Sequence, residues 1–366
     1  MLLVLLLASV TVYSQIRTES PNGFWPTDGY GEAIEINGDV LRIYEITALS
    51  CISAGENLHK TGVGAANEIV FSENDDTVRL SAGISPDTRW FHDDGSVSNV
   101  LLRRTYSLPK PCRQPPVDTP IMNYRVFWET FEENYPFFAL RKMNWLAVDK
   151  QFRPQVTQST KPEELFGILS NMIEPLHDAH TNVRAKSIKR QFEGYRPTDD
   201  PRQKKNVARI GEIIETKYIK GGLRDYCNKQ LQFGMLANSI GYLRVHSFAR
   251  YSSDSEFVKQ LDALESALDD IFKNSNRLTG LVIDVRINPG GSDVFGISIA
   301  SRLASQNYLA YSKVARNNIH DPNHRTAPQR IIVHVSKRPS FHGPVALLTG
   351  PDSNSGGSGI KVALSP

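Results

Sequence analysis

Alternation of strand and helix patterns from residue 240 onward restricts the possible folds more than any other feature of this sequence. Gly241–His246 has the pattern of a strand, Ser255–Lys273 has apolar residues at helical spacing, and Leu281–Val285 is typical of a buried strand. Two further segments continue the order, a helix at Ile297–Leu303 and a strand at Gly343–Thr349. Such alternation favours a mixed sheet with crossover helices, so we predict an α/β domain over residues 240–366.

Three regions occupy residues 16–183, upstream of this domain. Residues 16–110 are predicted to form a β-rich module, because short alternating runs lie between Gly, Asn and Asp clusters. Within it, Asn37-Gly38-Asp39 suits a hairpin turn, since Asn and Gly tolerate the positive φ that the turn requires. A proline cluster indicates a linker at residues 111–120, and apolar residues at helical spacing then predict a small helical bundle over residues 121–183.

Residues 184–239 give the weakest pattern of the chain. They are polar, and with 56 residues the segment is barely longer than the smallest independent domains. We interpret it as a connecting region that contains a β-hairpin near Glu212–Ile219.

The first residues are apolar and carry no charged side chain. Met1–Val12 is shorter than the ~20 apolar residues that span a membrane, and it resembles the apolar core of a secretory signal. We predict a signal peptide over residues 1–14 and a secreted, periplasmic or extracellular protein with no stable membrane insertion once the signal is removed. The alternative is a buried first strand. Export permits a disulfide, and Cys51 and Cys112 in one module are the predicted pair.

Charge and ligand spacing exclude several classes of function. A net charge of +3 is too small to indicate binding to nucleic acid. No Cys/His zinc spacing occurs, so we expect no metal and no cofactor. The sequence does not predict an oligomeric state.

Three segments carry residue types suited to chemistry. Asp284-Val-Arg-Ile-Asn-Pro-Gly-Gly291 joins a strand to a helix, where exposed N–H groups can bind an anion, although an ordinary junction with Arg286 paired to Asp284 explains it equally simply. Leu347–Ser358 leads from a strand into small residues that can present a serine, or form only a flexible loop. Glu174–Thr181 contains His177, Asp178 and His180, which suit a base, a weak metal site or a helix cap.

Taken in order, these segments resemble the tail-specific (C-terminal processing) protease family, above all its tricorn-core and interphotoreceptor-retinoid-binding-protein relatives. The resemblance extends over about residues 121–364 and rests on the following motifs: Asn134-Tyr-Pro-Phe-Phe138, Trp145, Leu176-x-Asp-x-His-Thr181, Gly241-Tyr-Leu-Arg-Val245, Asp284-x-Arg-x-Asn-x-Gly-Gly291, and Leu348-Thr-x(5)-Ser355-Gly356.

The resemblance implies a ClpP/crotonase-like fold for the C-terminal domain and a serine-type endopeptidase. It places Ser355 at the nucleophile and His180 at the base. The oxyanion hole would be formed by the N–H of Gly356 and by that of Gly290 or Gly291. The implied substrate is a peptide or protein, which is hydrolysed through an acyl-enzyme.

The sequence departs from the family at two places. Relatives commonly have Ser-Ala-Gly/Ala-Glu at the nucleophile, where this chain has Ser355-Gly-Gly-Ser358. Relatives also place a lysine or a glutamate about one helix and one strand beyond the serine, whereas Pro366 comes first, and Lys361 lies in the same predicted helix. A truncated fragment is the preferred explanation, and a degenerate homologue is the other. No insertion of binding-module size lies between His180 and Gly241, which favours the tricorn-like branch.

Two other functions stay open. A catalytically degenerate or truncated homologue could act as a binding protein for peptides or small apolar ligands. The β-rich module could instead be the functional part and bind a cell-surface or polymeric partner.

Overall fold

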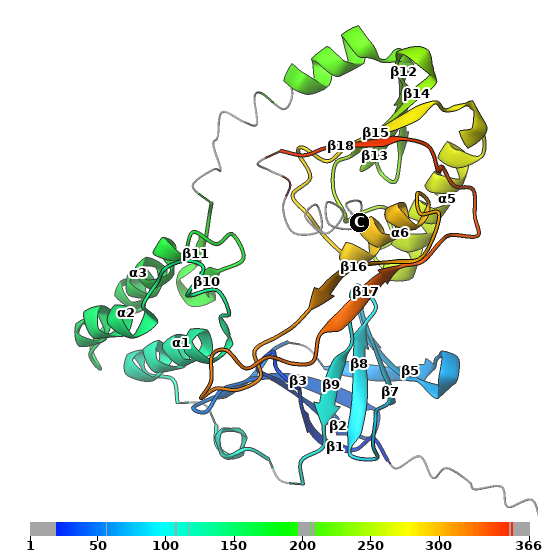
Figure 1. The fold of residues 1–366 in the computed structure, drawn as a ribbon. Helices are drawn as coiled ribbons and strands as arrows, with labels where there is room; N and C mark the ends of the chain where they lie inside the picture. The colour runs from blue at the N-terminus through cyan, green and yellow to red at the C-terminus, as the bar shows by residue number, and fades with distance from the viewer. Residues whose placement is uncertain are drawn as a thin grey trace, which may run out of the picture.

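The computed structural model describes residues 20–55, 57–106, 108–115, 117–196, 206, 209–350 and 353. The predicted signal peptide and the predicted Ser355 and Gly356 therefore lie outside the described residues. Figure 1 shows three parts: an N-terminal sheet, a helical segment beside it, and an α/β domain above it. This order confirms the predicted architecture of a β-rich module, a helical bundle and a mixed α/β domain.

The N-terminal sheet is antiparallel and curls back on itself. Its order is β1-β2-β3-β5-β6-β7-β8-β9, with β4 paired to β3, and single bridges from Phe24 to Thr105 and from Thr27 to Leu102 bring β1 against β9. The predicted turn at Gly38 joins β2 to β3. The strands are β1 Gly23–Pro26, β2 Glu32–Asn37, β3 Val40–Ile46, β4 Cys51–Ser53, β5 Leu58–Val63, β6 Ile69–Glu73, β7 Asp76–Ala82, β8 Thr88–Asp93 and β9 Val100–Arg103.

Cys51 of β4 and Cys112 form a disulfide, the pair given by the sequence. Cys112 lies in the short helical turn Lys110–Arg113, so the bond fastens the start of the linker to the sheet. Because the cross-link closes a loop of 61 residues, it removes much of the freedom of the unfolded chain.

Replacing both cysteines by serine is expected to lower the free energy of unfolding by about 4 kcal/mol, as loop-closure entropy predicts for a loop of this length. Urea unfolding followed by circular dichroism measures the loss. The wild-type protein under reducing conditions should match the double variant. A change below about 1 kcal/mol would contradict a stabilising cross-link.

The helical segment packs around an aromatic core. It contains α1 Pro120–Asn134, α2 Trp145–Phe152 and α3 Pro162–Ile173, followed by a hairpin of β10 Asn182–Ala185 and β11 Arg190–Glu193. Thr119 and Asn144 cap α1 and α2 by accepting backbone N–H groups. Tyr124 and Trp145 are almost fully buried in this core.

The α/β domain contains a five-stranded mixed sheet in the order β12-β13-β14-β15-β18. The first two pairs are antiparallel, whereas β14, β15 and β18 run parallel, so the carboxyl ends of these three strands lie at one edge. Its elements are β12 Lys220–Tyr226, β13 Leu231–Met235, β14 Ile240–Val245, α5 Phe257–Phe272, β15 Gly280–Asp284, α6 Asp293–Ser301 and β18 Val345–Leu348, with a separate pair of β16 Tyr308–Lys313 and β17 Gln329–Val333.

The position predicted for the hairpin in the polar region is wrong. Ile214–Tyr218 are helical, and the hairpin is β12–β13, which belongs to the mixed sheet. The sheet therefore begins before residue 240. Exposed polar residues of β12 and the positive φ of Gly221 and Gly222 conceal the strand pattern.

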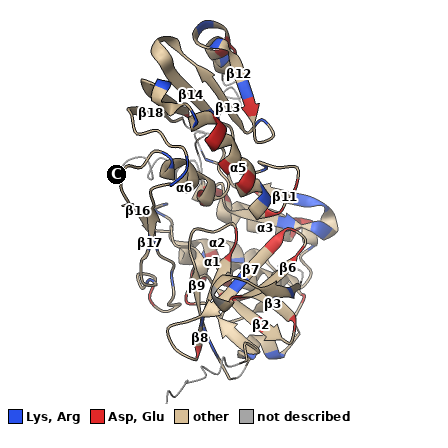
Figure 2. Ribbon diagram, turned by 90° about the vertical axis from the view of Figure 1, so that its right-hand side faces the viewer, with Lys and Arg blue, Asp and Glu red and all other residues tan. Residues whose placement is uncertain are grey.

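A buried arginine fastens α6 against α5. Arg302 is fully buried at the end of α6, and its Nη1 donates to Asp269 at 2.7 Å, while Nη2 pairs with Glu265. Both acids belong to α5, where the ribbon is red at acidic residues in Figure 2. Arg338 pairs with the same acids, with 2.5 Å between its Nη2 and Asp269. These ion pairs join the C-terminal end of α6 to α5 and so fix the position of the whole helix.

The segment between β16 and β17 reaches out of the α/β domain toward the other two parts (Figure 1). We call residues 314–328 the arm. Arg316 of the arm is buried, and its Nη1 donates to the carbonyl oxygens of Glu132 at 2.6 Å and Tyr135 at 3.4 Å. Asn317 donates to Asp28 at 2.9 Å. The arm therefore connects the α/β domain to the end of α1 and to the N-terminal sheet.

Candidate active site

His180 lies between α3 and β10, next to a buried carboxylate. Its Nδ1 is 3.2 Å from Oδ1 of Asp178, and its backbone N–H donates to the same oxygen at 3.0 Å. Asp178 is 5% exposed, whereas the imidazole side chain is 61% exposed. A carboxylate on Nδ1 favours the tautomer that leaves Nε2 free to accept a proton. Asp178 therefore orients the His180 ring and leaves its Nε2 available to accept a proton.

Tyr135 and Arg141 hold the other oxygen of Asp178. The Tyr135 hydroxyl donates to Oδ2 at 2.8 Å, and an Arg141 Nη2 lies 3.6 Å from it. Burial acts to raise the pKa of Asp178, but hydrogen bonds from His180 and Tyr135 and the charge of Arg141 outweigh it and lower that pKa. Burial, together with Asp178, raises the pKa of Tyr135 to about 12. At neutral pH the tyrosine thus donates to an ionised carboxylate.

For the base role that the resemblance implies for His180, Asp178→Asn is expected to lower peptide hydrolysis by about 10²–10⁴-fold, because an amide neither holds the tautomer of His180 nor stabilises the imidazolium that forms. Initial rates on a fluorogenic peptide measure the effect. His177→Asn is the control, since Asn tolerates the left-handed conformation of His177. Equal rates for Asp178→Asn and the wild type would contradict the orienting role.

The turn after β15 is built around a fully buried asparagine. The Nδ2 of Asn288 donates to the carbonyl of Val245 at 3.2 Å, and its Oδ1 accepts the N–H of Gly290 at 2.8 Å. The N–H of Phe248 donates to the carbonyl of Gly290, and the N–H of Ser292 donates to the carbonyl of Phe248, at 2.8 and 3.0 Å. These bonds fix the turn against the end of β14.

The two glycines of this turn differ in their N–H groups. The N–H of Gly290 already donates a hydrogen bond to Oδ1 of Asn288. Gly291 is exposed, and no described residue accepts its N–H. Its φ is +130°, and a Cβ at this position would lie 2.0 Å from the carbonyl oxygen of Phe248. Of the two glycines, only Gly291 therefore presents an unengaged N–H among the described residues, and the geometry requires glycine there.

Contacts of Asp284 hold the start of this turn in place. Arg286 forms a bidentate pair with Asp284, with Nε–Oδ1 and Nη2–Oδ2 distances of 2.9 and 2.6 Å. The Tyr242 hydroxyl donates to Oδ2 of Asp284 at 2.5 Å. The Arg286–Asp284 pairing expected for an ordinary strand–helix junction is therefore present. It also fixes Arg286 at the start of the turn.

Ser353 anchors the chain that leads to Ser355. It is 3% exposed, its Oγ donates to the carbonyl of Val285 at 2.6 Å, and the N–H of Gly350 donates to its Oγ at 2.9 Å. The N–H of Val285 donates to Leu348 at 2.9 Å. The segment after β18 is thus bound to the segment after β15 until two residues before the predicted nucleophile.

The structure brings some of the predicted residues together. Gly290 and Gly291 lie at the carboxyl edge of the parallel strands, as Ser353 does, whereas Ser355 and Gly356 lie outside the described residues. The β10–β11 hairpin, which follows His180 in the chain, stands apart from β15 and β18 (Figure 1). The sequence did not indicate the roles of Asp178, Asn288 and Ser353. An Asn two residues before Gly290 and a Ser three residues after Gly350 are turn signals that could have suggested the last two.

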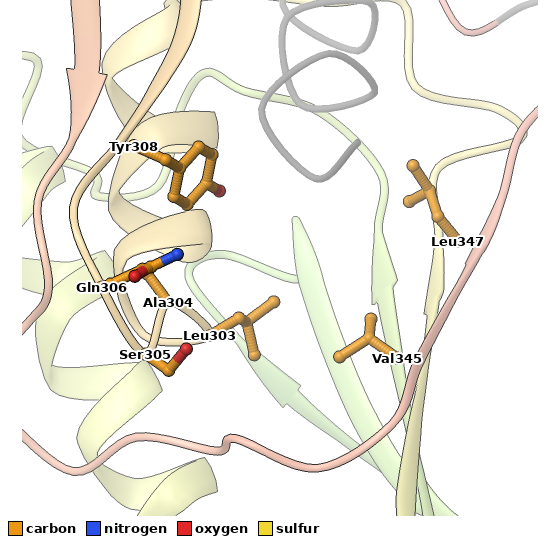
Figure 3. Close-up of a pocket in the computed structure, with 7 residues that line it drawn as sticks. All are labelled: Leu303, Ala304, Ser305, Gln306, Tyr308, Val345 and Leu347. Atoms are coloured by element: carbon orange, nitrogen blue, oxygen red, sulfur yellow. The ribbon is translucent and has the colours of Figure 1, made fainter. Parts of the chain in front are cut away.

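A small recess opens beside β18. It has a volume of about 250 Å³, and Figure 3 shows the side chains around it: Leu303, Ala304, Ser305, Gln306, Tyr308, Val345 and Leu347. Among the described strands, β18 is the last of its sheet. The recess is thus a hollow with mixed polar and apolar lining, next to the strand that leads to Ser353.

Two features are absent from the described part of the chain. Within the described ranges, no three His, Cys, Asp or Glu side chains gather closely enough to hold a metal ion. Among the same residues, no helix combines the length and apolar character that a membrane crossing needs.

Comparison with known proteins adds to this geometry. Residues 239–365 match the family model of peptidase family S41, and residues 119–174 match that of the tricorn protease C1 domain. No curated protein is similar enough in sequence to match. A candidate peptidase from Parabacteroides merdae ATCC 43184 is 25% identical, covering 68% of this chain and 73% of its own, with a TM-score of 0.54.

Two further solved structures are more distant. The photosystem II D1 C-terminal processing protease is 11% identical over 68% of this chain and 79% of its own, with a TM-score of 0.37. Mature CPAF complexed with lactacystin is 9% identical over 68% and 82%, with a TM-score of 0.46. The S41 match supports a serine peptidase in general. The resemblance drawn from the sequence is confirmed: this chain resembles the tail-specific proteases, with a peptidase family S41 region at residues 239–365 and a tricorn C1 region at residues 119–174.

Proposed function

We propose that this chain is a serine peptidase that cleaves peptide bonds through an acyl-enzyme at Ser355. Ser355 attacks the carbonyl carbon, and His180 takes the proton of its hydroxyl and returns it to the leaving amine. Water then releases the acyl group. The N–H groups of Gly291 and Gly356 stabilise the oxyanion of the tetrahedral intermediate.

One observation carries this proposal. The free N–H of Gly291 and the buried anchor Ser353 lie on the segments that follow the neighbouring parallel strands β15 and β18. Ser355 is two residues beyond the anchor. A serine nucleophile and an exposed backbone donor are the two elements that an acyl transfer needs.

The proposed base lies on another part of the chain. General-base catalysis needs Nε2 of His180 within about 2.6–3.2 Å of the serine hydroxyl, and apo structures often hold catalytic groups farther apart. We infer that the helical segment and the α/β domain approach each other in the substrate complex. The arm already connects them through Arg316 and the end of α1.

We also propose that the protein is exported. The disulfide between Cys51 and Cys112 supports this, because such bonds persist in oxidising compartments. The apolar run Met1–Val12 agrees with it.

Covalent labelling tests the proposal. The purified protein is treated with a biotinylated fluorophosphonate, digested, and the modified peptide is sequenced by mass spectrometry. We expect one modified residue, Ser355, and no labelling after denaturation. The test reads acylation of the serine directly, so it does not depend on complete turnover. Labelling of another serine, or of none, would rule out Ser355 as the nucleophile.

A further inference from the structure

A second cavity lies far from the carboxyl edge of the α/β sheet. Its volume is about 690 Å³, within the range of pockets that bind drug-sized ligands. One wall is Ser50–Ile52, which includes the start of β4, and another wall is Asn182–Arg184 of β10. Apolar side chains of α1 and α3 line it, among them Phe127, Phe131 and Leu169. The cavity thus lies between the N-terminal sheet and the helical segment.

Both strand walls meet the cavity along an edge of the strand. Successive side chains of a strand point to opposite faces, so a cavity that contacts three residues in a row runs beside the backbone. This applies to Ser50–Ile52 and to Asn182–Arg184 alike. These two walls therefore present backbone groups in addition to the side chains of Ser50, Asn182 and Arg184.

The hydrogen-bond register shows that the backbone groups of β10 are free. The N–H of Gly194 donates to the carbonyl of Thr181, so the antiparallel pair alternates with Val183 and Ala185 bonded to β11. The N–H and C=O groups of Asn182 and Arg184 point the other way. Within the described ranges, no hydrogen bond engages them.

The same holds for β4 on the opposite wall. The N–H of Thr47 donates to Ser50, and that of Ala54 donates to Ile43, which puts Ile52 in the bonded register with β3. The backbone groups of Cys51 and Ser53 then face away from β3. No described residue accepts or donates a hydrogen bond there.

We propose that this cavity binds an extended, apolar segment of another polypeptide, which pairs as a strand with the free edge of β10. Asn182 and Arg184 supply the backbone donors and acceptors, and alternate side chains of the bound segment pack on Phe127 and Phe131. β4 forms the opposite wall. Four residues of β10 match about 13 Å of partner strand.

The lining selects a neutral strand rather than a charged ligand. One acid and one base face the cavity, Glu45 and Arg184, and they come from opposite walls. The remaining described lining is apolar or uncharged. Such a wall of unpaired backbone groups over an apolar floor complements a polypeptide main chain. The proposal is independent of the catalytic roles proposed above.

The test uses the full chain with Ser355→Ala, so that no peptide is consumed. The probe is a fluorescein-labelled, capped eight-residue peptide of alternating threonine and valine, and its binding is followed by fluorescence anisotropy. A second peptide has the same side chains, but the alternate amides that would donate hydrogen bonds to β10 carry N-methyl groups. Strand pairing predicts saturable binding of the first peptide and at least about 10-fold weaker binding of the second.

Two variants locate the site. Arg184→Pro removes an N–H that faces the cavity and not the β11 ladder, and it is expected to weaken binding about 10-fold. Arg184→Ala keeps that N–H and should stay within about threefold of the parent. Amide exchange at Asn182 and Arg184 should slow when the peptide is present.

Three results would overturn the proposal. These are no saturable binding of the unmodified peptide, equal binding of the N-methylated peptide, and unchanged amide exchange in β10. If Arg184→Pro fails to fold, the comparison of the two peptides still decides between strand pairing and simple apolar contact.

Discussion

Ser355→Ala is expected to reduce peptide hydrolysis by about 10⁴–10⁶-fold, because it removes the group that forms the acyl-enzyme. Residual hydrolysis would come from the oxyanion donors and substrate binding alone. The rate constant kcat on a fluorogenic peptide measures the loss.

Ser353→Ala distinguishes the nucleophile from its anchor. The Ser353 hydroxyl bonds to the carbonyl of Val285 and the N–H of Gly350, and alanine leaves both without this partner. We expect a loss of about 1–3 kcal/mol in unfolding free energy and a smaller loss of rate than Ser355→Ala gives. Ser358→Ala serves as the neighbouring control. If Ser353→Ala reduced kcat as much as Ser355→Ala at unchanged stability, the two roles would have to be reassigned.

Gly291→Ala is expected to cost at least about 3 kcal/mol of unfolding free energy and to abolish fluorophosphonate labelling. A Cβ would lie 2.0 Å from the carbonyl oxygen of Phe248, where no side-chain rotation can relieve the clash. The backbone φ of +130° adds strain for any other residue. The turn must therefore shift, and the N–H of residue 291 moves with it.

Gly280→Ala is the matched control for this experiment. It lies in β15, and a Cβ there would meet its nearest neighbour, the carbonyl oxygen of Pro344, at an ordinary distance of 3.6 Å. This variant should fold and label like the wild type. Urea unfolding and labelling kinetics measure both variants. Wild-type stability in Gly291→Ala would show that the turn is more adaptable than its contacts indicate.

Apolar runs predicted most of the α/β domain, because the strands and helices that carry its core are buried on predictable faces. β15 and α5 follow this pattern closely. The pattern failed for β12, where solvent faces the strand and glycines interrupt it. It also gave no sign of the β16–β17 pair, whose partners are joined by the arm and not by a short turn.

The sequence motifs singled out the residues of the candidate site but not the contacts around them. The order of motifs placed His180 and the glycine pair, since each lies at the end of a recognisable element. Which glycine offers its N–H depends on the side chain of Asn288, and the orientation of His180 depends on Asp178. These are side-chain contacts made by the folded turns, so no periodicity in the sequence records them.

Tyr135 gives the arm a mechanical connection to the imidazole. Its carbonyl oxygen accepts from Arg316, and its hydroxyl donates to Asp178, which in turn bonds to His180. Tyr135 thus contacts the arm through its backbone and Asp178 through its phenol. A displacement of the arm, by a bound partner or a distant substitution, would therefore shift Tyr135 and, through Asp178, the orientation of the His180 imidazole.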